Sequence, residues 1–257
     1  MNRIDRLFQE RGSGILSVYA TAGYPELHDT TKVIRELVQN GVDMIEIGMP
    51  FSDPLADGPL LQVCNQQALD NGMTLNLLFE QLVSIKETVD IPLLLMGYLN
   101  PVLNYGIEKF CKRANEIGMD GIILPDLPVK EYTKHYQKHF QEHGLHMIFL
   151  ISPQTSEERI KEIDTLGSGF IYMVSSASTT GVKDGFQPEQ ISYFTRIKEM
   201  NLKLPQLIGF GISSAETYRQ ACKYAGGAII GSAFMKHLMG EGSIHDKISS
   251  FIHQIRP

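Results

Sequence analysis

One pattern recurs along the chain: an amphipathic segment ends in glycine, and a short apolar run follows almost directly. The four glycines are Gly41, Gly118, Gly144 and Gly167, and the runs begin at Val42, Met119, Leu145 and Phe170. Glycine adopts the left-handed backbone conformation that commonly ends a helix at little cost. Each of these glycines therefore predicts a junction between a helix and a strand.

Eight apolar runs are expected to form strands. They are residues 15–20, 42–47, 91–96, 119–124, 145–151, 170–174, 204–210 and 228–230. Helical patterns separate several of them, at residues 30–40, 75–89, 107–117, 130–143 and 156–166. Almost continuous apolar strands that alternate with helices indicate a parallel sheet whose faces are covered by helices.

The chain is 257 residues long, and eight strand–helix units of about 30 residues would use nearly all of it. This length favours the α/β class, as a single (β/α)8 TIM barrel with an extra N-terminal helix. An open doubly wound sheet is the alternative, because strand order is not visible in a sequence. No linker-like tract divides the chain, so we expect residues 1–257 to form one barrel domain.

Composition narrows the classes of partner and compartment. The net charge of −6 and the pI near 5.8 give no electrostatic basis for binding nucleic acid or an anionic membrane. Cys64, Cys111 and Cys222 lie far apart, without the spacing of a zinc site or a disulfide framework. We therefore expect a cytoplasmic protein that acts on small molecules or proteins.

Two segments that follow expected strands are long and polar, namely residues 50–59 and 175–188. In (β/α)8 barrels the active site is built from the loops at the carboxyl ends of the strands. Within the second strand, alternation puts Met44, Glu46 and Gly48 on one face and two isoleucines on the other. Glu46 should thus point into the barrel, either as a structural acid with a hydrogen-bond partner or as a catalytic group.

Asp57 is a second acid, in the loop that directly follows the strand of Glu46. An aspartate before Gly58 and Pro59 is common in turns, and it also suits a helix cap. Its place in the chain can equally bring it into the cavity of Glu46. Two carboxyl groups in different environments can divide acid and base roles between them.

The last two expected strands each end in glycine next to the start of a helix. Gly209 and Gly211 follow the seventh strand, and Gly231 and Ser232 follow the eighth. Such a loop either packs a helix tightly or lets backbone N–H groups reach an anion, and barrels commonly bind phosphate after strands 7 and 8. Gly181, in the sixth loop, can complete such a ring.

Two other kinds of chemistry are disfavoured. His135, His139 and His143 repeat every four residues, but the lysines and glutamines around them indicate a solvated helix face, and we expect no metal site. No lysine lies in an expected strand, so an amine for a Schiff base is missing. Phosphate binding without lysine or metal leaves acid/base catalysis.

The segment Glu46–Pro59, with the sequence EIGMPFSDPLADGP, closely resembles the signature of the tryptophan synthase alpha chain family. Shorter matches are spread along the chain in order, at residues 21–25, 96–101, 125–128, 209–213 and 231–232. The resemblance implies a (β/α)8 barrel that cleaves indole-3-glycerol phosphate to indole and D-glyceraldehyde 3-phosphate. It implies a lyase of L-tryptophan biosynthesis that needs no cofactor in this chain.

The resemblance also implies roles for individual residues. Glu46 would protonate indole C3 and accept the glyceryl hydroxyl proton, and Asp57 would bind the indole N–H. Tyr19 and Tyr172 would line the indole pocket. Four residues fall on the family's phosphate-binding positions, namely Gly181, Gly211, Gly231 and Ser232.

A partner is implied as well, a beta chain that carries pyridoxal phosphate and joins the alpha chain in an alpha2beta2 heterotetramer. Pro50 and Asp53 match the segment that contacts it, and Thr180 matches a residue that closes the sixth loop over the site. Ser176 and Ser178 stand where many members have Arg and Gly, which puts loop closure in question. A lyase that acts alone, a non-catalytic paralogue that binds indolyl phosphates and a barrel isomerase of phosphorylated sugars are the alternatives.

Overall fold

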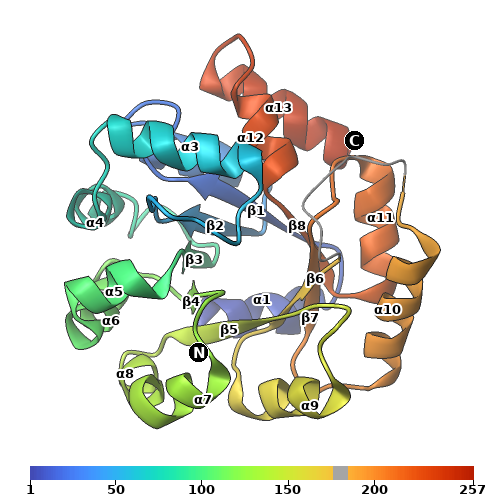
Figure 1. Cartoon of the computed structure of the whole chain (residues 1–257). Coiled ribbons are helices and arrows are strands. Elements are labelled where there is room, and N and C mark those ends of the chain that lie inside the picture. Colours follow the sequence, from blue (N-terminus) through green and yellow to red (C-terminus); the bar gives the residue numbers. More distant parts are fainter. Residues whose placement is uncertain (176–184) are drawn as a thin grey trace.

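The strands close into a barrel in a computed structural model that describes residues 1–175 and 185–257. Neighbours pair in chain order from β1 to β8, every pair is parallel, and β8 pairs back onto β1. Figure 1 shows the helices as a ring around these strands. The fold is therefore a (β/α)8 barrel, and the open doubly wound sheet is wrong.

The eight strands are β1 (Ile15–Thr21), β2 (Met44–Gly48), β3 (Leu93–Met96), β4 (Gly121–Ile123), β5 (His146–Ile151), β6 (Ile171–Val174), β7 (Gln206–Gly209) and β8 (Gly227–Ile230). The helices of the first half are α1 (Arg3–Arg11), α2 (Thr30–Gln39), α3 (Pro59–Asp70), α4 (Leu75–Val83), α5 (Leu99–Tyr105), α6 (Ile107–Glu116) and α7 (Val129–Glu131). After a π-helical turn (Tyr132–Tyr136) follow α8 (Gln137–Glu142), α9 (Glu157–Leu166), α10 (Pro188–Glu199), α11 (Ala215–Tyr224), α12 (Ser232–Leu238) and α13 (Ile244–Ile255).

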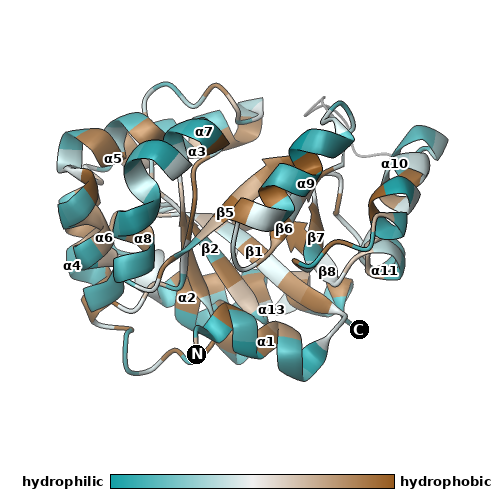
Figure 2. Ribbon diagram, turned by 90° about the horizontal axis from the view of Figure 1, so that it is seen from below, coloured by the Kyte–Doolittle hydropathy of each residue, from teal (hydrophilic) through white to brown (hydrophobic). Residues whose placement is uncertain are grey.

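Apolar side chains lie on both faces of the strands. One cluster fills the space between the barrel and its helices, and a smaller one, with Met44, Ile148 and Leu207, fills the barrel itself. Figure 2 shows brown strands inside a ring of helices that carry teal residues on their outer sides. Burial on both faces explains why the strands read as continuous apolar runs. No helix in the described ranges is long and apolar enough to cross a membrane.

The predicted N-terminal helix, α1, closes one end of the barrel (Figure 1). Ile4 is fully buried and belongs to the cluster inside the barrel, and Leu7 and Phe8 pack against the same cluster. The rings of Phe8 and Phe170 lie 6.0 Å apart. The end that α1 covers is the one at which the strands begin, so the opposite end is left for the site.

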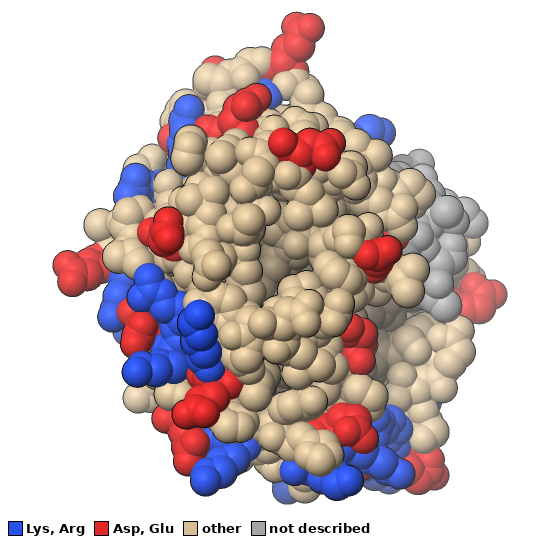
Figure 3. Space-filling view, turned by 60° about the vertical axis from the view of Figure 1, so that its left-hand side comes forward, with Lys and Arg blue, Asp and Glu red and all other residues tan. Residues whose placement is uncertain are grey.

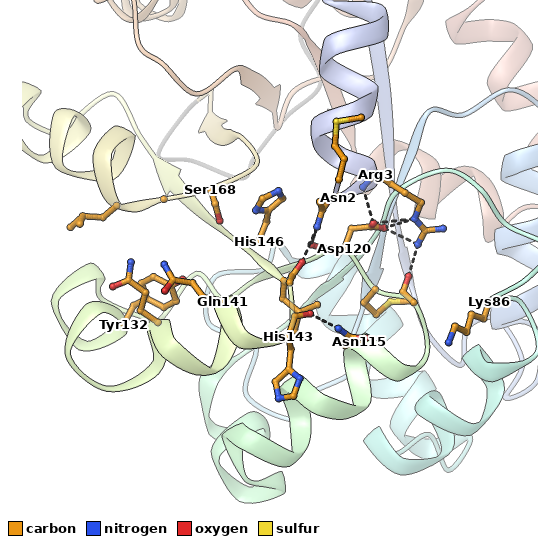
Figure 4. A pocket seen from close by; sticks show the side chains of 18 of the residues that line it. Asn2, Arg3, Lys86, Asn115, Asp120, Tyr132, Gln141, His143, His146 and Ser168 are labelled. Atoms are coloured by element: carbon orange, nitrogen blue, oxygen red, sulfur yellow. Dashed lines mark hydrogen bonds and ion pairs between the residues drawn. The ribbon is translucent and has the colours of Figure 1, made fainter.

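Two buried aspartates fasten α1 to the strands. Asp120, just before β4, accepts hydrogen bonds from Arg3 Nε at 3.0 Å and from the backbone N–H of Leu93 at 2.8 Å, and Figure 4 shows the first of these contacts. Asp43, just before β2, pairs with Arg11 at 3.1 Å and also with Arg256. Each end of α1 is thus tied to the start of a different strand.

Three sequence predictions need correction. Gly167 has φ −75°, so it is not a left-handed helix end; a Cβ there would lie 2.8 Å from the carbonyl oxygen of Ile163, and close approach explains the glycine. The helix expected at 130–143 is interrupted by the π-helical turn, where Tyr132 packs edge-on against Phe140 and Phe149. The helix expected at 75–89 ends at Val83, where the N–H groups of Ser84 and Ile85 bind carbonyls three residues earlier and the Ser84 hydroxyl donates to the carbonyl of Gln81 at 2.9 Å.

We expect Asp120→Ala to destabilise the protein strongly. The substitution leaves Arg3, of which 20% of the side chain is exposed, without its partner, and it removes the acceptor for the N–H of Leu93. Breaking such a pair costs about 3 kcal/mol of unfolding free energy. Urea unfolding followed by circular dichroism measures the loss, and one domain predicts a single transition.

The matched control is Asp90→Ala. Asp90 also pairs with an arginine of α1, Arg6, at 3.0 Å, but 88% of its side chain is exposed. Solvent-exposed ion pairs contribute little to stability, so the urea midpoint should hardly move. Equal shifts of the midpoint in the two variants would contradict the anchoring role of Asp120.

Candidate active site

Glu46 points into the barrel from the middle of β2, as the alternation predicts, and none of it is exposed. Ser17 of β1 donates a hydrogen bond from Oγ to Glu46 Oε1 at 2.9 Å. The second oxygen, Oε2, is buried and has no hydrogen-bond partner among the described residues. The carboxyl group is therefore anchored through one oxygen and has its other oxygen unpaired.

Burial raises the pKa of Glu46 from 4.5 to about 8, and the hydrogen bond from Ser17 opposes this shift. A carboxylate loses its hydration inside the barrel, because the cluster beneath it consists of apolar side chains such as Met44, Leu94 and Ile148. At neutral pH the group is mostly protonated. It can give a proton to a bound molecule and then take one back.

Asp57 lies at the end of the second loop, just before α3 begins at Pro59. Asn65 of α3 donates a hydrogen bond to Asp57 Oδ2 at 2.9 Å, and the backbone N–H of Asp57 closes a turn onto the carbonyl of Pro54 at 3.0 Å. Burial raises the pKa of Asp57 from 3.8 to about 6, although hydrogen bonds from Asn65 and Tyr98 oppose the rise. Asp57 therefore sits in a turn, as one reading of the sequence proposed, and it is also a partly buried carboxyl group.

Two buried tyrosines lie close to the carboxyl groups. Burial and then the negative charges of Glu46 and Asp57 raise the pKa of Tyr172 on β6, and burial and the charge of Asp57 raise the pKa of Tyr19 on β1. A Cβ at Gly48 would collide with the Tyr19 ring, and one at Gly209 with the Tyr172 ring. The inward glycines make room for two neutral phenols beside the acids.

Beyond the tyrosines lie the ends of β7 and β8, which are paired neighbours. Gly211 has φ +75° and is exposed, and Ser175 Oγ donates to the carbonyl of Phe210 at 2.7 Å. Gly231 precedes α12, whose first N–H groups receive no side-chain cap, and Ser232 is exposed in the first turn. The uncapped N–H groups at the start of α12 are suited to an anion, whereas α11, which follows β7, is capped by Ser214.

Several of the residues predicted for the site either lie apart from these side chains or are not among the residues that the structure describes. Thr180 and Gly181, together with Ser176 and Ser178, lie outside the described residues. Pro50 is half-buried and Asp53 is exposed, with its carboxylate accepting a hydrogen bond from Ser52. The structure thus brings Glu46, Asp57 and the two tyrosines together, and it leaves Asp53 facing solvent.

Three residues that support the carboxyl groups were missed in the sequence. They are Ser17, Asn65 and Tyr98, whose hydroxyl accepts a hydrogen bond from the N–H of Ala56 at 3.0 Å and lies against Asp57. A signal existed for Ser17, since strand alternation puts it on the same face of β1 as Tyr19. No such signal existed for Asn65, because its hydrogen bond to Asp57 depends on the path of the second loop.

A polar groove of about 810 Å³ lies at the other end of the barrel, beside the start of α1. Figure 4 shows Asn2 and Arg3 at this groove, both directed toward Asp120. The side chains of Glu46 and Asp57 do not line it. Among residues 1–175 and 185–257 no three His, Cys, Asp or Glu side chains are placed to hold a metal ion, and His135 is exposed.

Comparisons with known proteins agree with this architecture. The sequence profile described as tryptophan synthase alpha chain matches residues 6–254. The tryptophan synthase alpha chain of Flavobacterium johnsoniae is 58% identical over 256 residues, covering 100% of both chains, and that of Bacteroides fragilis is 53% identical, covering 94% of this chain and 92% of the relative.

Solved structures give the same result. Tryptophan synthase subunit alpha from Legionella pneumophila superposes with a TM-score of 0.90 at 33% identity, covering 100% of this chain and 97% of that one. A chain of tryptophan synthase from Mycobacterium tuberculosis, in an aminoacrylate-bound form, gives 0.87 at 27% identity, with coverage of 99% and 98%. Because the family profile matches residues 6–254 and full-length relatives are more than 50% identical, the chain belongs to the tryptophan synthase alpha chain family.

Proposed function

We propose that Glu46 and Asp57 carry out the reaction of this family in the present chain. As a member the chain is a lyase of L-tryptophan biosynthesis, which cleaves indole-3-glycerol phosphate to indole and D-glyceraldehyde 3-phosphate. The observation that carries the proposal is the buried, anchored carboxyl group of Glu46, whose Oε2 has no partner among the residues that the structure describes. A structural acid would use both oxygens in hydrogen bonds.

Cleavage of the C–C bond requires that indole C3 be protonated first, because the ring can then accept the electrons of that bond. Glu46 is mostly protonated at neutral pH and can supply this proton. The carboxylate that results accepts the proton of the glyceryl hydroxyl as the bond breaks. The electron pair of the broken bond restores the aromatic indole, and the hydroxyl carbon becomes the aldehyde.

Asp57 would act as the opposite member of the pair. Its pKa of about 6 leaves it mostly ionised at pH 7, so it can accept a hydrogen bond from the indole N–H. That contact stabilises the positive charge that the ring acquires when C3 is protonated. Tyr19 and Tyr172 would supply the flat walls of the indole pocket, since both are buried beside the acids.

The phosphate group of the substrate would be bound by the backbone at the ends of β7 and β8. Gly211, Gly231 and Ser232 would donate N–H groups there, and Gly181 of the sixth loop would join them. This chain would use no cofactor, and pyridoxal phosphate would belong to a beta chain. The cysteines Cys64, Cys111 and Cys222 are free, which is consistent with a cytoplasmic enzyme.

A beta chain would dock over the second loop, completing an alpha2beta2 heterotetramer. Pro50 and Asp53 lie in that loop, and the Leu55 side chain beside them is 92% exposed. Val63 of α3 and Leu103 of α5 are also exposed. In Figure 3, which brings this side of the barrel forward, an uncharged area separates the groups of charged side chains. Exposed apolar residues of this kind fit a protein partner.

We expect Glu46→Gln to abolish indole formation and to leave substrate binding nearly unchanged, because the amide keeps the shape but cannot transfer a proton. The rate of indole release from the purified chain measures catalysis, and titration with an inert indolyl phosphate measures substrate binding. A variant that retains more than about a tenth of the rate would remove Glu46 from the acid/base role. Release of indole itself separates this lyase from a sugar phosphate isomerase and from a non-catalytic paralogue.

The pH dependence follows from the raised pKa of Glu46. The protonated form starts the reaction, so the rate of indole release should fall as the pH rises through about 8. Ionisation inside the barrel is also unfavourable, so the folded state should lose stability between about pH 4.5 and pH 8. Glu46→Gln should remove this part of the stability change, which urea titrations at pH 5 and pH 9 would measure.

We expect Asp57→Asn to lower the turnover number by about a hundredfold, since the amide carries no negative charge to stabilise the protonated ring. The control is Asp70→Asn at the exposed end of α3, which should behave like the native enzyme. Steady-state assays at pH 7.5, near neutrality, compare the two. An unchanged rate in Asp57→Asn would reduce this residue to a turn former.

We expect a cognate beta chain to co-elute with this chain and to raise its lyase turnover about tenfold or more, by ordering the loops over the site. Asp53→Lys should weaken the association, because it reverses a charge in the docking loop. Glu10→Lys, an equal charge change on exposed α1 at the other end of the barrel, should not. Neither co-elution nor a rate increase would favour a lyase that acts alone.

A further inference from the structure

The inward face of β1 carries hydroxyl groups beside Glu46, next to the apolar cluster that fills the barrel. Ser17, Tyr19 and Thr21 alternate along that face, and the register pairs Tyr19 with Glu46 of β2. Ser17 is completely buried, as is Glu46, and their 2.9 Å hydrogen bond is the one polar contact of the carboxyl group among the described residues. The Ser17 hydroxyl makes no other side-chain hydrogen bond among the described residues.

On the side of α1, apolar side chains surround the pair and offer no replacement for that hydrogen bond. Ile4, Leu94, Ile123 and Ile148 belong to the apolar cluster on the side of α1, and a Cβ at Gly121 would already touch Ile4 and Ile148. Without Ser17 the carboxyl group would have two unpaired oxygens, free to exchange places by rotation. With Ser17 the two oxygens are distinct.

We propose that Ser17 is a positioning residue, which holds Oε1 of Glu46 and so makes Oε2 the oxygen that exchanges protons with the substrate. This inference rests on the acid/base role proposed for Glu46. It assigns the two proton transfers, first to indole C3 and then from the glyceryl hydroxyl, to one fixed atom. Fixed geometry of this kind is what gives intramolecular proton transfer its speed.

Within residues 1–175 and 185–257, few other titratable groups lie near Glu46; one of them is Cys64 beside Tyr19, whose own pKa is raised by burial. Tyr19 approaches from β1, Tyr172 from β6 and Asp57 from the second loop, with Tyr98 behind it. The phenols stay neutral in the working range because burial raises the pKa of each. A change in the pH profile after substitution of Ser17 can therefore be traced to Glu46 or Asp57, and Asp57 titrates at lower pH.

The test replaces Ser17 and follows indole release against pH. Ser17→Ala and the size-matched Ser17→Cys remove a strong donor, so the alkaline limb should move up by about one pH unit, because the ionised carboxylate loses its hydrogen bond. The turnover number should fall about tenfold, with KM changed less than about threefold. Ser17→Thr keeps the hydroxyl and should restore the native limb.

A pH titration of the Glu46 carboxyl carbon by NMR, in the whole chain, reports the change in the pKa of Glu46 without relying on activity. The control is Ser168→Ala, which removes a hydroxyl that accepts the N–H of Met147 at the other end of the barrel; its pH profile should equal the native one. If Ser17→Ala and Ser17→Cys keep the native pH profile of indole release and Glu46→Gln is inactive, the role of Ser17 is overturned and that of Glu46 is not. An active Glu46→Gln would instead overturn the role of Glu46 itself.

Discussion

The structure depends on one unfavourable interaction, the burial of an ionisable carboxyl group inside a barrel of apolar side chains. Glu46 has no exposed surface and one hydrogen bond among the described residues, and burial raises its pKa to about 8. Such a group is a poor contributor to stability. The same burial makes it a proton donor at neutral pH, and the closed barrel is what keeps water away from it.

The barrel tolerates the buried Glu46 carboxyl group because its two ends have different roles. At the end covered by α1, Asp120 and Asp43 are fully paired with arginines and with backbone N–H groups, and these contacts hold the strand starts together. At the other end Glu46 is left incompletely paired and inward glycines replace side chains. Stability thus comes from the closed end, and the open end is free for chemistry.

Strand alternation predicted the inward Glu46, and the count of apolar runs predicted the barrel, because both depend on local periodicity. The partner of Glu46 was not predictable in the same way. Ser17 meets it only through the register of β1 on β2, which pairs Tyr19 with Glu46 and is a property of the assembled sheet. Gly167 misled for another reason, since its small size serves close packing against the carbonyl of Ile163 and the side chains of Phe149 and Leu204, and not a left-handed turn.

The different pKa values of the two carboxyl groups explain how one site can hold an acid and a base. Both have a raised pKa, but Asp57 is less buried and has hydrogen bonds from Asn65 and Tyr98, so its pKa is about 6 against about 8 for Glu46. Between these values Glu46 is mostly protonated and Asp57 mostly ionised. The neutral phenols of Tyr19 and Tyr172 fill the space around them without adding charge. A molecule that must gain a proton at one atom and carry positive charge at another meets both groups in the state that it needs, in the pH range of a cell.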